Sequence, residues 1–278
     1  PVIRGPMSYF WRREKTGRRA LPDPMEQTPP LTPRRVRFSD LGRWSYQRAW
    51  DFQEVLFSET IERKSANRSR PQSEQIPTED TLLFVEHPHV YTLGKSGDYA
   101  NLLANETQLQ ELGIEFFKIN RGGDITYHGP GQLVGYPILD LDHYYTDIHR
   151  YLRTLEDVII DTLAEYGLSG DRSPGETGVW LDVGTPFARK ICAMGVRASR
   201  WVTMHGWALN VNTDLKYFQY IVPCGITDKA VTSLHLEVGH PIDETELKGK
   251  VQRHFASRFG ITLAETSWEA LHPGSSPG

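Results

Sequence analysis

The chain has little cysteine, no long apolar run and no excess of positive charge. Its 278 residues include only two cysteines, which do not form a C-x-x-C pair. A disulfide framework is therefore excluded, and a reducing compartment, by default the cytoplasm, is expected. No apolar stretch is long enough to span a membrane or to act as a secretory h-region. A net charge of −4 and an isoelectric point near 6.2 argue against general nucleic-acid binding, which needs a basic face.

The remaining composition is that of a globular protein with a polar segment at each end. With 38% hydrophobic and 24% charged residues and a mean hydropathy of −0.47, the chain can bury one large core. Residues 1–35 are rich in proline and arginine, which predicts a tail that is disordered or lies on the surface and leaves an organelle transit peptide open. Residues 263–278 are predicted to form a flexible tail. The domain between them, 36–262, contains a polar insertion loop at 62–80.

Hydrophobic periodicity alternates between helical and extended patterns along this domain. Asp147 is the expected cap of a helix with one apolar stripe, and Gly260 is expected to end the last helix. The pattern lacks a strict βαβ alternation, so it predicts an α+β fold with a mixed, largely antiparallel sheet and packed helices. The expected helices lie near 46–57, 102–112, 148–163 and 244–259, and the expected strands near 81–85, 114–119, 133–139, 178–182, 189–196 and 203–211.

Two separate segments offer a nucleophile and a base. Cys224 lies between Pro223 and Gly225, a pairing that is typical of a sharp, exposed turn. Lys190 lies in the segment RKICAMG, residues 189–195. A thiol is the best side-chain nucleophile for an acyl thioester, so the pair indicates acyl transfer. Taken alone this signal is weak, because a lone cysteine is more often a small buried hydrophobe than a catalyst.

A glycine-dense segment, RGGDITYHGPGQLVGY at residues 121–136, adds a candidate ligand site. Glycines let a backbone approach a ligand closely, and Arg121 and His128 are placed to reach polar groups of that ligand. A glycine-rich hairpin without a ligand explains the composition equally well. The segment is not a phosphate loop, because it lacks that glycine spacing and the Lys-Ser/Thr ending.

Together these segments resemble the lipoyl(octanoyl) transferases, which are octanoyl-[acyl-carrier-protein]:protein N-octanoyltransferases. The resemblance is carried by residues 121–136, by EHPHVYTLG at 86–94, by 190–195, by HGWALNVN at 205–212 and by PCG at 223–225, in the family's order. It covers roughly residues 35–262 and is specific, because several motifs with different chemistry agree. It implies the catalytic fold of biotin/lipoyl protein ligases.

The resemblance also implies roles for single residues. Cys224 is the implied acyl-thioester nucleophile, and Lys190 is the group that lowers the pKa of its thiol. The implied substrate contacts are Arg121, Gly122, Gly123, Asp124, Ile125, Thr126, Tyr127, His128, Ala193, Met194, Gly195, Gly206, Trp207 and Ala208.

The donor that the resemblance implies is octanoyl-acyl carrier protein. The implied acceptors are lipoyl domains of 2-oxoacid dehydrogenase complexes and the glycine cleavage H protein, each modified on a specific lysine. No cofactor, metal or ATP is expected, because exchange between thioesters is nearly isoenergetic and aminolysis to an amide runs downhill. After acylation removes the thiolate charge, Lys190 is expected to accept the proton of the incoming amine, so that one residue serves both half-reactions. Tyr91, Met194 and Trp207 are the expected lining of the acyl tunnel, and backbone N–H groups near Gly195 or Gly225 are expected to hold the oxyanion.

Cys192 is the rival nucleophile. It follows Lys190 by two residues in a strand-like stretch, so a regular strand would point both side chains to one face. Family members commonly carry a small residue at this position, so the cysteine is a departure. Cys224 is favoured because its turn predicts exposure, whereas Cys192 has apolar neighbours.

The other candidate polar residues have structural explanations. Four histidines, His87, His89, His128 and His205, match no zinc spacing, and His205 is expected to be structural. The acidic residues Asp140, Asp142 and Asp147 flank a strand-to-helix turn, where capping explains them.

Two other functional classes stay open on the sequence. The first is an ATP-dependent lipoate or biotin protein ligase on the same fold, which would not need the cysteine. The second is a non-catalytic module that binds acylated or lipoylated carriers. The Pro223-Cys224-Gly225 turn disfavours the ligase, and the combination of Cys224 with Lys190 disfavours the binding module.

Overall fold

The computed structural model describes residues 33–222 and 230–272. Their centre is an eight-stranded sheet with the strand order β10-β8-β9-β6-β2-β1-β11, in which β7 also pairs with β8. The pairs β2·β6, β6·β9, β8·β9 and β7·β8 are antiparallel, while β1·β2, β1·β11 and β8·β10 are parallel. The strands are β1 Arg34–Arg43, β2 Thr81–Glu86, β6 Gln132–Ile138, β7 Val179–Leu181, β8 Arg189–Ser199, β9 Val202–Asn210, β10 Ala230–Val231 and β11 Ile261–Glu265. The predicted α+β fold with a mixed, largely antiparallel sheet is confirmed.

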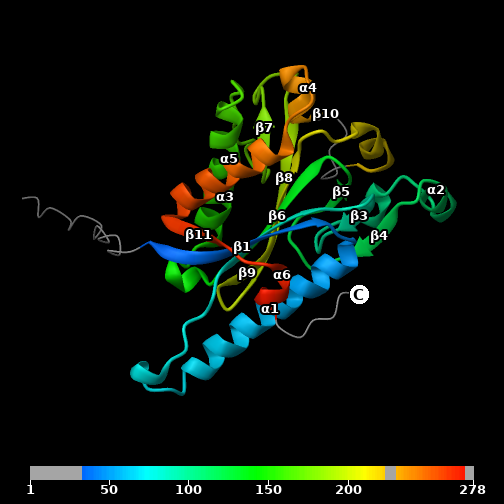
Figure 1. Ribbon diagram of the computed structural model, residues 1–278. Helices are drawn as coiled ribbons and strands as arrows, with labels where there is room; N and C mark the ends of the chain where they lie inside the picture. The colour runs from blue at the N-terminus through cyan, green and yellow to red at the C-terminus, as the bar shows by residue number, and fades with distance from the viewer. Residues whose placement is uncertain (1–32, 223–229, 273–278) are drawn as a thin grey trace, which may run out of the picture. The chain divides into compact units, whose positions relative to one another are not determined.

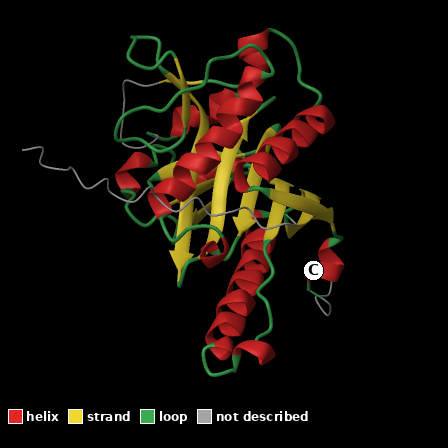
Figure 2. Cartoon of the chain, turned by 90° about the vertical axis from the view of Figure 1, so that its left-hand side faces the viewer, coloured by secondary structure: helices red, strands yellow, loops and turns green. Residues whose placement is uncertain are grey.

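Helices pack on both faces of this sheet (Figure 1). Helices α3 (Ile148–Ala164) and α5 (Glu244–Phe259) cover one face, over a cluster that contains Phe84, Trp207 and Phe255. Helix α1 (Tyr46–Asn67) covers the other face, over a cluster that contains Val134 and Met204. Figure 2 shows α1 extending well beyond the strands. Short helices α4 (Leu234–Val238) and α6 (Trp268–Leu271) complete this part of the chain.

A second, three-stranded sheet lies near the N-terminal end of α1 (Figure 1). Its order is β4-β3-β5, from strands β3 (Val90–Leu93), β4 (Glu115–Lys118) and β5 (Ile125–His128). Its cluster of buried residues includes Tyr91 and Tyr127, with the short helix α2 (Glu106–Glu111) beside it. Because β5 leads into β6 through the turn at Gly129–Gly131, the glycine-rich segment joins the two sheets.

The predicted caps and acidic turn are confirmed. The Asp147 carboxylate accepts the Arg150 N–H and so caps α3, and Gly260 ends α5 with a φ of 63° that only glycine adopts readily. Asp140 accepts the Asp142 N–H, and both carboxylates pair with Lys64 at 2.5 and 2.8 Å. The acidic residues therefore act in capping and ion pairing.

The ends of the described domain extend beyond the predicted boundaries. Strand β1 begins at Arg34, inside the tail predicted for 1–35, while residues 1–32 lie outside the described part. At the other end, Leu271 is 3% exposed and the Trp268 ring packs on Trp44 with centroids 5.4 Å apart. Residues 263–265 thus belong to β11, which pairs with β1, and 268–271 form α6, which packs its apolar side chains; residues 273–278 lie outside the described part. Helix α1 also occupies the first part of the 62–80 insertion, ending at Asn67.

Candidate active site

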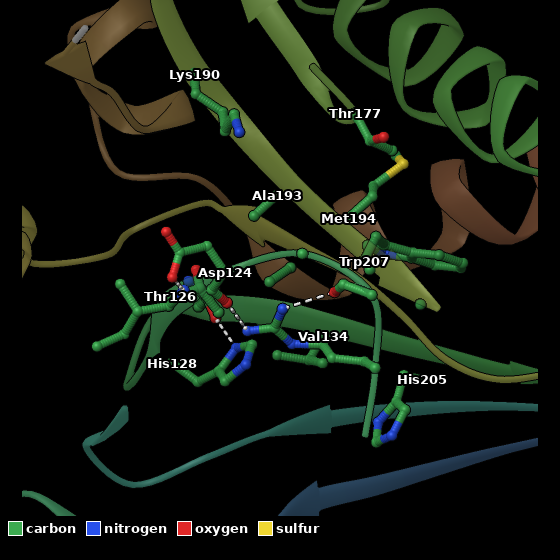
Figure 3. A pocket seen from close by; sticks show the side chains of 18 of the residues that line it. Asp124, Thr126, His128, Val134, Thr177, Lys190, Ala193, Met194, His205 and Trp207 are labelled. Atoms are coloured by element: carbon green, nitrogen blue, oxygen red, sulfur yellow. Dashed lines mark hydrogen bonds between the residues drawn. The ribbon is translucent and has the colours of Figure 1, made fainter. Parts of the chain in front are cut away.

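One cavity of about 500 Å³ lies where the glycine-rich segment meets strands β6, β8 and β9. Figure 3 shows side chains from these segments facing a shared space, with Lys190 and His205 on opposite sides of it. The cavity contains all but one of the substrate contacts implied by the resemblance. Its lining includes Arg121, Gly122, Gly123, Asp124, Ile125, Thr126, His128, Ala193, Met194, Gly195, Gly206, Trp207 and Ala208, together with Lys190.

Tyr127 is the exception, because side chains alternate along a strand. In β5, Thr126 and His128 face the cavity. Tyr127 faces the other side, where its ring stacks on Tyr217 with centroids 5.3 Å apart and its hydroxyl lies 2.7 Å from Nδ1 of His89. The described Tyr127 side chain therefore supports the small sheet instead of lining the cavity.

Lys190 is anchored at the start of β8 by strands on both sides. It pairs with Trp180 of β7 and with Val231 of β10, and its carbonyl accepts the Thr232 N–H at 2.9 Å. The residue is only 8% exposed, and Nζ lies 4.6 Å from the centroid of the Trp180 ring. The proposed nucleophile, Cys224, lies outside the described residues.

Cys192 lies in the main core, not in the cavity. Strand β8 contains an irregularity: Trp180 pairs with Lys190, but the preceding Val179 pairs with Cys192. The extra residue breaks the alternation that would place Cys192 on the Lys190 face. The thiol is fully buried among apolar side chains, and this burial raises its pKa well above the ordinary value. A thiol in this setting is a poor nucleophile.

Arg121 shapes the glycine-rich loop from within. Its guanidinium donates to the Gly122, Thr92 and Asp124 carbonyls, each at 2.9 Å, and to the Thr92 hydroxyl at 3.0 Å. The loop is also fastened to β8, because the Gly122 N–H donates to the Val196 carbonyl at 3.0 Å. Arg121 therefore places a buried positive charge at the cavity wall while it holds the loop backbone in place.

A chain of hydrogen bonds runs from the glycine-rich segment to Thr232, the residue that follows β10. Nδ1 of His128 lies 2.8 Å from Oε1 of Gln132, whose amide nitrogen donates to the Asn210 side chain at 2.9 Å. Asn210 in turn donates to the Thr232 carbonyl at 2.9 Å. The polar wall of the cavity is therefore continuous with the strand beside Lys190.

His205 has unusual geometry for the middle of a strand. Its φ is 60°, a left-handed value that costs roughly 1–3 kcal/mol for a residue other than glycine. Its backbone N–H donates to Oε1 of Gln53 at 2.9 Å, and Nε2 lies 3.3 Å from Oδ1 of Asn120. Among the described residues, Nδ1 has no hydrogen-bond partner. His205 lines the cavity, so its position goes beyond the structural role expected from the sequence.

The buried histidines around the cavity are held neutral. Burial, followed by the nearby charges of Arg121 and Arg197, lowers the pKa of His205 to about 3. Burial, followed by repulsion from His87, lowers the pKa of His128 well below its ordinary value. Because both rings are weak bases at neutral pH, they can hydrogen bond to a substrate but are poorly suited to accept a proton from it.

Apolar side chains line part of the cavity. Val134, Met194, Trp207 and Ala208 all contribute to the wall. Tyr91, expected in the same tunnel, is instead buried in the small sheet, where its hydroxyl donates to the Tyr217 carbonyl at 2.6 Å. The cavity thus combines an apolar surface with a polar wall, as ligand sites commonly do.

Several lining residues were not assigned to the site from sequence. Tyr46 opens α1 and stacks on His128 with centroids 5.9 Å apart, but its helical pattern indicated only core packing. Gln132 and Asn210 lie inside motifs that carry the resemblance, which is the signal that points to them. Thr177 comes from a loop without a comparable signal. No group of three or more metal-ligating side chains occurs among residues 33–222 and 230–272.

Comparison with known proteins identifies the family. Residues 45–256 match the family model described as the lipoyl protein ligase A/B catalytic domain. An octanoyltransferase of Flavobacterium psychrophilum is 61% identical over 82% of this chain and 98% of its own length. An octanoyltransferase of Cytophaga hutchinsonii is 54% identical over 85% of this chain and 97% of its own length. The chain belongs to the lipoyl protein ligase A/B catalytic domain family, among its octanoyltransferases.

Solved structures share the fold at low sequence identity. A putative lipoate protein ligase from Thermoplasma acidophilum superposes with a TM-score of 0.60 at 17% identity, over 85% of this chain and 92% of that one. A lipoate-protein ligase A bound with ATP superposes with a TM-score of 0.61 at 18% identity, over 87% and 92%. Both confirm the expected ligase-like catalytic fold. Within the described part of the chain, no helix is long and apolar enough to cross a membrane.

Proposed function

We propose that this protein transfers an octanoyl group from a thioester donor to a specific lysine of lipoyl domains, the first step of endogenous protein lipoylation. The activity follows from the octanoyltransferase relatives. The main structural support for the site is that residues of three separate motifs line a single cavity. These motifs are 121–136, 190–195, which includes Lys190, and 205–212. The proposed donor is octanoyl-acyl carrier protein, and the proposed acceptors are lipoyl domains of 2-oxoacid dehydrogenase complexes and the glycine cleavage H protein.

The octanoyl chain occupies the apolar part of this cavity, against Val134, Met194 and Trp207. Gly195 and Gly206 let the acyl group approach the backbone of β8 and β9, because neither presents a side chain. Burial of the chain follows its apolar area and stabilises the complex by about 0.8 kcal/mol per buried CH₂. Neutral His128, which the Gln132 amide holds in place, offers a polar contact for the donor.

In the first half-reaction, the Cys224 thiolate attacks the thioester carbonyl. A new C–S bond forms at Cys224, the donor C–S bond breaks, and the leaving thiolate takes up a proton. A free thiol with a pKa of about 8.5 is only a few per cent ionised at neutral pH, so the Lys190 ammonium raises the reactive fraction. The pairing of Ala230–Val231 with Arg189–Lys190 supports this proposal, because it fastens the chain beside Lys190 six residues after Cys224.

In the second half-reaction, the lipoyl-domain amine attacks the acyl-cysteine. Once Cys224 is acylated, the Lys190 ammonium has no anionic partner and releases its proton to solvent. A C–N bond then forms, the C–S bond to Cys224 breaks, and the neutral Lys190 amine accepts the proton of the attacking amine. The lowered pKa values of His128 and His205 are consistent with this assignment, because they make both imidazoles weak bases beside Lys190 in the cavity. No step requires ATP, a metal or a cofactor.

The decisive experiment is intact-mass analysis after mixing the protein with octanoyl-acyl carrier protein. We expect a hydroxylamine-labile adduct of octanoyl mass, located on Cys224 by peptide mapping. Cys224→Ala should remove both adduct and transfer, whereas Cys192→Ala should keep most activity because that thiol is buried and outside the cavity. An octanoyl group mapped to Cys192 would overturn the assignment.

The same assay separates the other functional classes. An ATP-dependent ligase would modify the lipoyl domain from free octanoate plus ATP and would lose activity when ATP is removed or EDTA is added. A non-catalytic binding module would consume no thioester in a single turnover. We expect transfer from the thioester without ATP and in the presence of EDTA.

A further inference from the structure

Trp180 is buried outside the hydrophobic clusters of the described chain. Its neighbours in β7, Val179 and Leu181, pack into the main core. Because side chains alternate along a strand, Trp180 points to the opposite side. It is only 3% exposed, yet it belongs to none of the clusters of buried apolar residues found in this part of the molecule. The Trp180 side chain therefore lies apart from the main core that Val179 and Leu181 join.

One group that the Trp180 ring contacts is the proposed base, Lys190. Nζ of Lys190 lies 4.6 Å from the Trp180 ring centroid, within the range of a cation–π interaction. The two residues are direct partners across β7 and β8. Trp180 is fixed on its other edge by Asp171, whose N–H donates to the Trp180 carbonyl at 2.8 Å and whose carbonyl accepts the Trp180 N–H at 2.9 Å. The Trp180 backbone is therefore held on one side by β8 and on the other by the isolated β-bridge to Asp171.

The charge on Lys190 decides when this contact matters. An indole face attracts an ammonium ion but offers little to a neutral amine. Lys190 has to be an ammonium while it stabilises the thiolate, and it has to be a neutral amine when it accepts a proton in the second half-reaction. The Trp180 ring thus favours the ammonium state of Lys190, which serves the first half-reaction but not the second.

We propose that Trp180 is a positioning residue that holds the Lys190 ammonium in the cavity and thereby supports acylation of the enzyme, but not aminolysis. This inference rests on the proposed function of Lys190 and Cys224. It assigns the single aromatic residue of the sequence GVWL, residues 178–181, to the chemistry of the site. A desolvated cation–π contact corresponds to an effect of about 3- to 30-fold on the step that uses the ammonium.

The test separates the two half-reactions in a Cys192→Ala background, where Cys224 is the remaining cysteine. Trp180→Leu should slow acylation by octanoyl-acyl carrier protein about 3- to 30-fold and shift the pH midpoint of Cys224 alkylation upward. Trp180→Phe, which keeps a weaker aromatic face, should fall between it and the parent. Aminolysis by a lipoyl domain, measured from acyl-enzyme isolated beforehand, should not slow in either variant.

Leu181→Ala is the matched control, because Leu181 lies next to Trp180 in β7 but packs into the core. It should lower the unfolding temperature without changing the ratio of the two rates. If Trp180→Leu slows both half-reactions equally, or slows neither, the positioning role is wrong and Trp180 is a structural residue. If the parent protein forms no acyl-enzyme at all, the proposed function itself fails, which is a different result.

Discussion

Burial and strand irregularity decide the chemistry of single residues in this protein. Cys192 and Lys190 are two positions apart, but the irregular pairing of β7 with β8 sends one into the core and leaves the other on the cavity wall. For Tyr127 the strand is regular, and the alternation of side chains along β5 turns this member of the glycine-rich segment away from the cavity. Motif membership therefore places a residue near a site, whereas the local pairing decides whether its side chain reaches it.

The proposed dual role of Lys190 can be tested by separating charge from proton transfer. Lys190→Met should raise the pH needed for Cys224 alkylation and reduce octanoyl transfer by about 100-fold or more. Lys190→Arg keeps the positive charge but cannot release a proton near neutral pH. The arginine variant should therefore retain much of the alkylation rate and accumulate octanoyl-Cys224, which intact-mass analysis can follow over time.

The arginine variant can also contradict the proposed dual role of Lys190. If it turns over normally with the lipoyl domain, Lys190 is only an electrostatic partner of the thiolate and another group accepts the proton. Cys192→Ala serves as the control for these alkylation measurements, because it removes the other thiol and lies in the core rather than in the cavity.

At the scale of elements, the site depends on how closely the glycine-rich loop approaches β8. A Cβ at Gly195 would lie 2.6 Å from the Gly122 carbonyl oxygen and 3.1 Å from Cδ of Arg121. A Cβ at Gly206, its partner in β9, would lie 2.2 Å from the Gly135 carbonyl oxygen. Both glycines are thus required by backbone packing, in addition to any contact with substrate.

Gly195→Ala should push the 121–124 loop away from β8. We expect a loss of stability of about 1–3 kcal/mol, as in other overpacked sites, and a raised KM for the octanoyl donor. Gly249→Ala is the matched control, because this helical glycine has its nearest neighbouring atom at 4.0 Å. The control should stabilise the protein by about 0.5–1 kcal/mol and leave KM unchanged. Equal KM values for both variants would show that the loop does not depend on this close approach.

The element boundaries that the sequence predicted well are those with local signals. Asp147 and Gly260 mark their helix ends by capping and by a left-handed turn, and both are confirmed. The residues missed near the termini have no such signal: Trp268 is ordered by contact with Trp44, more than two hundred residues earlier in the chain. Trp180 was likewise not assigned to the site from sequence, because its contact with Lys190 depends on the pairing of β7 with β8. Long-range contacts of this kind are not visible in hydrophobic periodicity.

At the scale of the whole molecule, three buried histidines link stability to pH. Burial lowers the pKa of His87 to about 4 and, together with nearby positive charge, lowers the pKa of His205 to about 3. Burial also lowers the pKa of His128 well below its ordinary value. As the pH falls below about 6.5, the unfolded chain binds protons on these histidines while the folded protein does not. Stability from these groups is therefore complete above about pH 6.5 and is lost as the pH falls toward 4.

His87→Gln tests this linkage through the slope of stability against pH. Each neutral histidine contributes about 1.4 kcal/mol per pH unit between its two pKa values, so the slope between pH 6 and pH 5 should fall by about that amount in the variant. The side chain of His87 bonds the Trp44 carbonyl and the Tyr136 hydroxyl, both at less than 3 Å, so the variant will also lose stability at pH 7. The slope is independent of that loss, because it depends only on the difference in bound protons. Urea unfolding of both proteins at several pH values measures it, and identical slopes would show that His87 titrates alike in the folded and unfolded chain.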